Sequence, residues 1–468
     1  MAPGQEEKQA KKLSAFSLIF LGLGSTVGSS FFLASGIAVH AAGPAVLLGY
    51  LFSGLIFYLV LVSLGHLALK YRERESVRGY VEETLGPVGA FMTGWNLWLT
   101  SLVGMVSEAV AMAIYTRFWF PGLPLWALVL AYGLLVAVIN YFGVDIVDKF
   151  EGGLSLIKIT SVLAFTGVML YIIFSHRPAA TATGLVPFFP NGLKGLGQAV
   201  VVTTFAYGAG ALTAAVGDTK NPRRAIPLAT MGMALTQALF FLLPVTTLVA
   251  VTPWTLISSQ SSPFVTGLEH VGIRLGGSVL NAIVLVASFS VLLGSMFTAI
   301  TMLVSLARDR EAPSFLAGKE GKRPLKALLV TAGVMLLVSL LAIFLPRHIY
   351  QYAITATGYF SFVNWGAILA ARLYLCLPLQ NEGRLEIGGL FVTVTGLAGL
   401  VVVSLMGLTM PEQRFALVVM VISTLALLGA GCLVKRGEQA PAVTAVGNKE
   451  RAGGWLERLL GSLRRNQV

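Results

Sequence analysis

The sequence is poor in the residues from which most enzymes and metal sites are built. Only two of its 468 residues are cysteine and five are histidine, and 12% are charged, which is about half the charged fraction of soluble domains. Cys376 and Cys432 lie in apolar stretches, so no disulfide framework is expected. The histidines show no ligand spacing, and no phosphate loop of the GxxxxGK(S/T) type is present. We therefore expect neither an enzyme nor an ATP-driven pump, and no metal or cofactor.

The sequence is instead rich in long apolar runs. Hydrophobic residues make up 56% of the chain, and the mean hydropathy is +0.80. Runs of about 20 apolar residues, each long enough to cross a bilayer, recur along nearly the whole length. This pattern predicts an all-α polytopic membrane protein. The first run is too long for a cleaved signal peptide, so we interpret it as a retained span.

We expect about twelve membrane-spanning helices joined by short connections, with no soluble domain. The predicted spans are 14–38, 43–69, 88–117, 124–146, 151–175, 196–217, 226–251, 276–307, 326–345, 349–377, 386–408 and 413–434. The transmembrane domain is thus placed at 14–435, between a short N-terminal segment (1–13) and a basic tail (436–468). Within the tail, residues 455–465 form a basic amphipathic stretch that is expected either to lie on the inner leaflet or to bind a partner or fray.

The basic residues predict the orientation of the spans. The net charge of +12 comes from Lys and Arg at the ends of the spans, which indicates topology rather than binding to nucleic acid. Most of these residues fall on one side, and the positive-inside rule makes that side cytoplasmic. Both termini are then cytoplasmic in a multi-pass protein of the cell membrane. Helical spacing at 72–86 predicts an interfacial helix, and the outer loop 252–273 is long enough for a lid over a vestibule.

The first apolar run is interrupted at 22–36 by glycine and hydroxyl residues, where a spanning helix would favour Leu or Val. In hydrocarbon, irregular backbone is tolerated only where it is buried in protein or lines a cavity. Gly24 and Gly28 also form a GxxxG pair, which taken alone is equally well explained by close helix packing. A second interruption occurs at 203–211, about five spans later. Two such interruptions favour a pair of broken helices over simple helix packing. Such a pair is the best sequence indication of a transporter's substrate site.

Two ionisable residues lie inside predicted spans, where charged side chains are rare and usually functional. Glu108 is in the third span and Lys158 in the fifth, about 12 Å along its helix if that helix begins near Phe150. For Lys158, the alternative is that the side chain reaches out to the inner headgroups. For Glu108, the alternative is a purely structural hydrogen bond to a neighbouring helix.

Several motifs follow one another along the chain. They are GSTVGSSFF at 24–32, AGPAVL at 42–47, YVEETLGP at 80–87 with TGW at 93–95, FAYG at 205–208 with DTKNPRRAIP at 218–227, and LVSLARDREAP at 303–313. In this order and spacing they resemble the motifs of amino acid permeases of the amino acid–polyamine–organocation superfamily, over roughly 14–435. The resemblance implies a five-plus-five inverted repeat with discontinuous first and sixth helices, two further C-terminal helices, and alternating access. It also implies a zwitterionic amino acid as substrate, usually transported with a proton.

The resemblance further assigns roles to individual residues. Gly28, Ser29 and Ser30 match the turn that binds the substrate carboxylate, where N–H groups at a half-helix N-terminus suit an anion. The residues whose carbonyl groups match the amine site are Thr26, Phe205, Ala206, Tyr207 and Gly208. Lys158 matches a lysine that carries the coupling proton in some relatives, and Glu108 is the second candidate. The family fold places Lys158 near the first helix and near Thr298 and Thr301.

Departures from the family pattern bear on substrate and coupling. Ser30 stands where relatives often have Gly, His66 and Ala211 where they often have Glu, and Thr301 where they often have Arg. The missing acid at Ala211 favours a small or neutral amino acid over a cationic one. Three other classes stay open: a membrane sensor that keeps the fold but not transport, a channel-like passive pathway, and an amino acid/polyamine exchanger. The particular amino acid, the direction of net flux and the oligomeric state also stay open.

Overall fold

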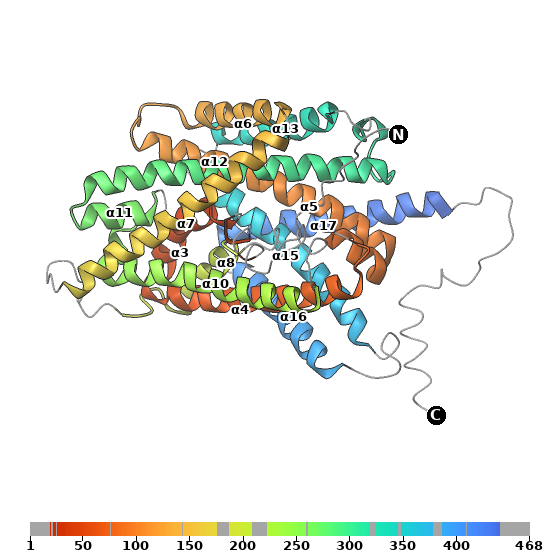
Figure 1. Ribbon diagram of the computed structural model, residues 1–468, viewed down its shortest axis with the longest axis horizontal. Coiled ribbons are helices and arrows are strands. Elements are labelled where there is room, and N and C mark those ends of the chain that lie inside the picture. The colour runs from red at the N-terminus through yellow and green to blue at the C-terminus, as the bar shows by residue number, and fades with distance from the viewer. Residues whose placement is uncertain are drawn as a thin grey trace, which may run out of the picture.

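The computed structural model describes most of the chain between Ile19 and Gln439. The described residues are 19, 22–24, 26–74, 76–142, 144–175, 187–207, 222–258, 261–318, 323–344, 348–377, 386–408 and 410–439. Every regular element within these ranges is a helix. Most of the long helices run side by side along the long axis of the molecule (Figure 1). The prediction of an all-α protein is therefore confirmed.

The helices follow one another through mostly short connections. Their bounds are α2 (Ser29–Phe32), α3 (Ala34–Ala42), η1 (Gly43–Ala45), α4 (Val46–Lys70), α5 (Val77–Arg117), α6 (Leu125–Phe142), α7 (Val144–Phe174), α8 (Gly192–Thr204), α10 (Pro222–Val251), η2 (Trp254–Leu256), α11 (Pro263–His270), α12 (Arg274–Arg308), η3 (Ser314–Leu316), α13 (Leu325–Ser339), α14 (Leu341–Phe344), α15 (Ile349–Cys376), α16 (Ile387–Leu408) and α17 (Pro411–Gln439). In the described ranges, nine segments are long and apolar enough to cross a membrane. A polytopic membrane fold is thereby confirmed, while the count of twelve spans and the inverted repeat stay predictions.

The helices turn apolar side chains outward, as a bilayer requires. The exposed large residues include Leu134, Leu163, Leu235, Phe391 and Ile422. A water-soluble monomer rarely exposes apolar surface on so many helices. Polar side chains are turned inward instead, and Ser53, Asn96 and Gln237 are fully buried. The surface of the bundle is thus apolar, and the groups that could bind a polar ligand lie in its interior.

The interfacial helix predicted at 72–86 forms the first part of α5. Ser76 caps it, because its hydroxyl accepts a hydrogen bond from the Gly79 N–H at 3.1 Å. Gly86 ends it with φ 82° and ψ −177°, a backbone conformation that other residues rarely adopt. Pro87 then begins the long part of α5, at a position where its missing N–H costs nothing. The Gly86-Pro87 pair therefore produces the kink.

The boundary between α6 and α7 differs from the prediction. α6 ends at Phe142 rather than at 146, and α7 begins at Val144 rather than near 150. Lys158 consequently lies roughly 21 Å along its helix at the α-helical rise, near the middle of α7 rather than in its first part.

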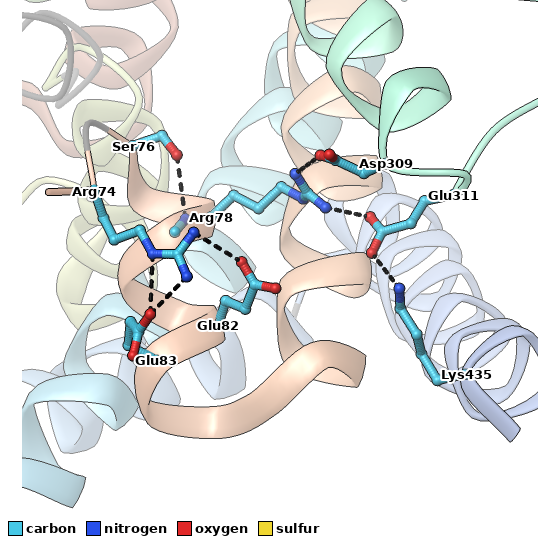
Figure 2. Close-up of polar contacts among 9 residues, drawn as sticks. Arg74, Ser76, Arg78, Glu82, Glu83, Asp309, Glu311 and Lys435 are labelled. Atoms are coloured by element: carbon cyan, nitrogen blue, oxygen red, sulfur yellow. Dashed lines mark hydrogen bonds and ion pairs between the residues drawn. The ribbon is translucent and has the colours of Figure 1, made fainter. Parts of the chain in front are cut away.

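The two ends of the bundle are named after the expected orientation: the inner end carries the start of α5, and the outer end carries α11 (Figure 1). At the inner end, Arg78 contacts Asp309 and Glu311, which follow α12 (Figure 2). The other Glu311 oxygen contacts Lys435 of α17 at 3.0 Å, and Trp95 Nε1 donates to the Glu311 carbonyl oxygen at 3.2 Å. The Glu311 side chain is only 2% exposed. One buried carboxylate thus connects α5, the end of α12 and α17.

Replacing Glu311 by Gln should destabilise the protein strongly. The change leaves the Arg78 guanidinium and the Lys435 ammonium beside a neutral group at a mostly buried position. Removing one partner of a buried ion pair typically costs about 3–5 kcal/mol. Because Asp309 still faces Arg78, we expect the lower value, about 3 kcal/mol. Thermal unfolding of the purified protein in detergent measures the loss.

Glu83→Gln is the matched control at the same end of the bundle. Glu83 contacts Arg74 at 2.7 Å (Figure 2), but the two side chains are 37% and 46% exposed. Exposed pairs of this kind contribute about 1 kcal/mol or less. If the two variants lost equal stability, the burial of Glu311 would not make its ion pairs more stabilising than the exposed pair of Glu83.

Candidate functional site

The first span is broken inside the interruption predicted at 22–36. Residues 22–24 and Thr26 are helical, Val27 and Gly28 are not, and α2 begins at Ser29. α2 and α3, which only Leu33 separates, form the outer half of this span. The N–H group of Ser29 therefore stands at the start of a half-helix, where it has no helical partner.

The sixth predicted span is interrupted as well. α8 ends at Thr204, Phe205 and Ala206 form a turn, and Tyr207 has no regular structure. Ala206 and Tyr207 are buried, and Phe205 is half-buried. Gly208 lies outside the described residues. Three of the four residues predicted in this break are therefore placed in irregular backbone in the interior.

An aromatic side chain of α10 brings the two breaks together. The Phe241 ring stacks on Phe31, from the first break, with 4.8 Å between centroids. It also meets the ring of Tyr207, from the second break, at 5.1 Å. The Tyr207 hydroxyl donates to the Tyr50 carbonyl oxygen of α4 at 2.9 Å, and Phe264 of α11 covers Phe31 at 5.0 Å. Segments about 180 residues apart in the sequence thus share one packed wall.

The carboxylate of Glu108 occupies the start of the outer half-helix. The Ser29 N–H lies 3.2 Å from one carboxylate oxygen and 3.1 Å from the other, and Glu108 is buried. An anion here satisfies an N–H group without a helical partner and lies at the positive end of a helix dipole. A Cβ atom at Gly28 would lie 2.9 Å from Glu108 Oε1. A larger residue at position 28 would therefore have to displace the carboxylate from this position.

Lys158 connects α7 to the first span and to α12. Its Nζ donates to the Gly24 carbonyl oxygen at 3.2 Å and to Ser290 Oγ at 3.1 Å, and the residue is only 2% exposed. The alternative in which Lys158 reaches out to the headgroups is therefore wrong. The neighbours expected on α12 are wrong too, because Thr298 and Thr301 are exposed and bond to carbonyls of their own helix. Ser290 takes their place because Lys158 lies deeper than the predicted start of its helix implied.

Glu108 and Lys158 hold the two sides of one break. Four charged side chains are buried in the described part of the chain: Glu108, Lys158, Glu311 and Arg372. Glu311 and Arg372 are engaged in ion pairs. Glu108 and Lys158 instead contact the uncharged backbone of the first span, after and before its break. Their charges are therefore directed at the break in this span.

Gln237 of α10 belongs to the site, although the sequence analysis missed it. It is fully buried, and its Nε2 donates to Thr26 Oγ1 at 3.0 Å. The Thr26 hydroxyl donates its own proton to the Leu23 carbonyl oxygen at 3.1 Å, so it accepts from Gln237. The Gln237 Oε1 atom has no hydrogen-bond partner among the described residues. An uncharged amide in an apolar run carries no sequence signal, and only the packing of α10 beside the first break reveals it.

The remaining predicted residues have different surroundings. The Ser30 hydroxyl donates to the Thr26 carbonyl oxygen at 3.3 Å, so this carbonyl already has one partner inside the break. His66 is exposed on α4, where its Nδ1 lies 2.9 Å from the Val62 carbonyl oxygen. His66 is therefore not part of the buried site. Ala211 lies outside the described part of the chain.

Two broken spans, an anion and a cation at one break, and a polar interior under an apolar surface define a membrane transport protein. The chain belongs to the amino acid permease family, whose sequence profile matches residues 17–436. The resemblance drawn from the motifs is thereby confirmed.

Relatives in Bacillus subtilis (strain 168) align with most of the chain. The uncharacterized amino acid permease YtnA is 29% identical over 429 residues, which are 89% of this chain and 93% of the relative. The gamma-aminobutyric acid permease is 27% identical over 379 residues, with shares of 79% and 81%. The amino-acid permease AapA is 27% identical over 391 residues, with shares of 81% and 84%. Membership in this family makes amino acid transport the function at the level of the family.

Enlarging Gly28 to Val should weaken substrate binding at the first break. The new Cβ would lie 2.9 Å from both Glu108 Oε1 and Val291 Cγ2, and a β-branched side chain also restricts the backbone of the break. We expect the affinity for substrate to fall at least about tenfold, equivalent to about 1.4 kcal/mol. Isothermal titration on protein in detergent measures it.

Gly167→Val serves as the control for this substitution. Gly167 lies on the exposed face of α7, and a Cβ there meets nothing within 4 Å. We expect this variant to bind substrate like the wild type. Unchanged binding by Gly28→Val would mean that the first break is a packing feature and that the site lies elsewhere.

Proposed function

We propose that the protein is a proton-coupled secondary transporter that moves small or neutral amino acids across the cell membrane by alternating access, with both termini cytoplasmic. The observation that carries the proposal is the contact between the Glu108 carboxylate and the Ser29 N–H. An anion already held at this half-helix supports a carboxylate site there. Family membership supports an amino acid as the molecule that brings the carboxylate.

The substrate carboxylate and Glu108 compete for one backbone donor in this proposal. Two carboxylates at the same place repel each other, and protonation of one removes the repulsion. A neutral Glu108 is also a weaker acceptor than the substrate anion. The arriving amino acid therefore displaces the Glu108 side chain from Ser29 most easily when Glu108 binds a proton. Glu108 acts as an internal occupant of the site until the substrate arrives.

The substrate ammonium is assigned to the acceptors around the two breaks. The carbonyl groups of Phe205, Ala206 and Tyr207 lie in irregular backbone, and that of Thr26 lies at the end of the helical segment directly before the first break. Gln237 Oε1 adds a buried acceptor without a partner among the described residues. A buried acceptor left unpaired costs about 1–3 kcal/mol. An ammonium group would recover that cost, which supports Gln237 as a substrate ligand.

Lys158 is assigned the coupling proton. In its charged form the ammonium joins Gly24 of the first span to Ser290 of α12, and we infer that this bridge holds the outward-open state. Loss of the proton removes the charge and weakens both hydrogen bonds, which releases the first span for inward opening. Proton binding and conformation are then linked through two states with different affinities for the proton. Glu108 is the second proton-binding group.

The proposal is tested by uptake into proteoliposomes under an inward proton gradient. The panel contains glycine, L-alanine, L-serine, L-leucine, L-lysine, L-glutamate and γ-aminobutyrate, the last because one relative is named for it. We expect accumulation of small neutral amino acids and little of L-lysine or L-glutamate. Binding without accumulation would indicate a sensor, and flux without saturation or counterflow would indicate a channel.

Lys158→Met should abolish proton-driven accumulation while exchange without a gradient survives, since the substitution removes the titrating group and keeps much of the volume. Lys158→Arg should fail to couple as well, because a guanidinium stays charged at any relevant pH. Lys70→Met, at an exposed lysine of α4, is the control and should behave like the wild type. If Lys158→Met still concentrates L-alanine with protons as the sole driving force, Lys158 is not the carrier.

Gln237→Leu should raise the KM for uptake about tenfold, because a hydrogen bond to a charged group contributes roughly 1.5–3 kcal/mol. The same change at Gln413, a buried residue of α17 near Tyr359, removes an amide away from the breaks. Gln413→Leu should leave the KM unchanged. Equal effects of the two substitutions on KM would show that Gln237 acts through stability and not through the substrate.

A further inference from the structure

A polar cavity lies at the outer end of the bundle, apart from the contact between Glu108 and Ser29. Its volume is about 480 Å³, and its walls come from α3, α11 and the outer ends of α5, α6, α12 and α15. Small-molecule sites typically have volumes of about 300–1,000 Å³. The cavity is therefore large enough for one amino acid with several water molecules.

Two buried hydroxyl groups belong to residues that line this cavity. Tyr115 of α5 and Ser262, directly before α11, are 1% and 2% exposed. Neither hydroxyl has a hydrogen-bond partner among the described residues. Buried polar groups in native proteins are nearly always hydrogen-bonded to protein, water or ligand. The walls of the cavity thus include two residues whose hydroxyls lack a partner among the described residues.

Charges of both signs line the same cavity. Arg117 from the end of α5 and Glu269 from α11 are both exposed there. Neither forms an ion pair with any residue that the structure describes, and the Arg117 guanidinium reaches only the Pro121 carbonyl oxygen, at 3.4 Å. A ligand with a single charge would meet one like charge in this cavity. A zwitterion, which carries an ammonium and a carboxylate, is complementary to both.

The bottom of the cavity touches the central site. Tyr350 lines the cavity, and its hydroxyl donates at 2.8 Å to the carbonyl oxygen of Ser29, the same residue whose N–H holds Glu108. Tyr115 follows Glu108 by two turns of α5 on the same face, roughly 10 Å further out. The outer cavity and the Glu108 carboxylate thus lie along one line through the bundle, with Tyr350 between them.

We propose that the outer cavity is a first binding site for zwitterionic amino acids. Arg117 faces the substrate carboxylate, Glu269 faces the ammonium, and the Tyr115 and Ser262 hydroxyls bond the same two groups. Breaking the bond from Tyr350 to Ser29 opens the passage to Glu108. This inference rests on the proposed transport function and adds a separate outer step to it.

The kinetics of L-alanine uptake into proteoliposomes test whether Arg117 and Glu269 contribute to substrate binding. Arg117→Gln and Glu269→Gln should each raise the KM about three- to fivefold, the effect of losing one exposed charge contact, with the maximal rate little changed. Arg274→Gln is the matched control, because Arg274 is an exposed arginine at the outer end of α12 that does not line the cavity. Its KM should equal that of the wild type.

Protection of an introduced thiol locates the binding step. Thr266→Cys places a thiol on the cavity wall in a Cys432→Ser background, where the remaining Cys376 is buried. Excess L-alanine should slow modification by a membrane-impermeant thiol reagent at least twofold. This protection should survive Gly28→Val, which disables the central site, and with Arg117→Gln it should require about three- to fivefold more L-alanine.

The outcomes separate this site from the transport function. If the wild type does not take up L-alanine, the proposed function fails for small neutral substrates, while the protection experiment still decides on the cavity. If uptake is normal but Arg117→Gln and Glu269→Gln match Arg274→Gln and L-alanine gives no protection, the outer site is overturned and transport stands. Loss of protection with Gly28→Val would assign the bound L-alanine to the central site and also overturn the proposal.

Discussion

Every peptide group of an interrupted helix must find a partner inside the membrane, and the architecture of the site depends on that constraint. The break at Val27 and Gly28 leaves a carbonyl on one side and an N–H on the other without their helical partners. Lys158 binds the Gly24 carbonyl, and the Glu108 carboxylate binds the Ser29 N–H. A buried charge alone would be costly. The break and the two charges therefore stabilise each other.

The number of hydrogen-bond and ion-pair partners differs between Glu311, which has a structural role, and Glu108, whose partner a ligand could take over. Glu311 at the inner end binds two cations, one at each oxygen, so it has no capacity left for another partner. The Glu108 carboxylate accepts from the backbone N–H of Ser29, which a second carboxylate can also bind. Gln237 Oε1 and the Tyr115 hydroxyl have no partner in the described ranges. Partners supplied by the described residues are thus complete at the Glu311 carboxylate and incomplete at Gln237 and Tyr115, along the path proposed for the substrate.

Aromatic packing and hydrogen bonds divide that path into two compartments. Phe31, Phe241 and Tyr207 form a packed wall that joins the two breaks, and Phe264 covers this wall from α11. The hydrogen bond from the Tyr350 hydroxyl to the Ser29 carbonyl links the outer cavity to the first break. A packed aromatic wall resists change, whereas one hydrogen bond contributes only about 1 kcal/mol net. Along the proposed path, this hydrogen bond is the weaker of the two contacts.

The sequence alone determined the membrane fold, the family, the break in the first span and the two intramembrane charges. These follow from composition, from apolar runs and from rare residues such as Glu108 and Lys158, which stand out because hydrocarbon tolerates so few of them. Only the tertiary structure decided their partners. Lys158 binds Ser290 and not Thr298 or Thr301 because α7 begins earlier than its apolar run suggests. Gln237 acquires its position from the packing of α10 beside the first break, since hydrogen bonds between distant segments leave no local pattern in the chain.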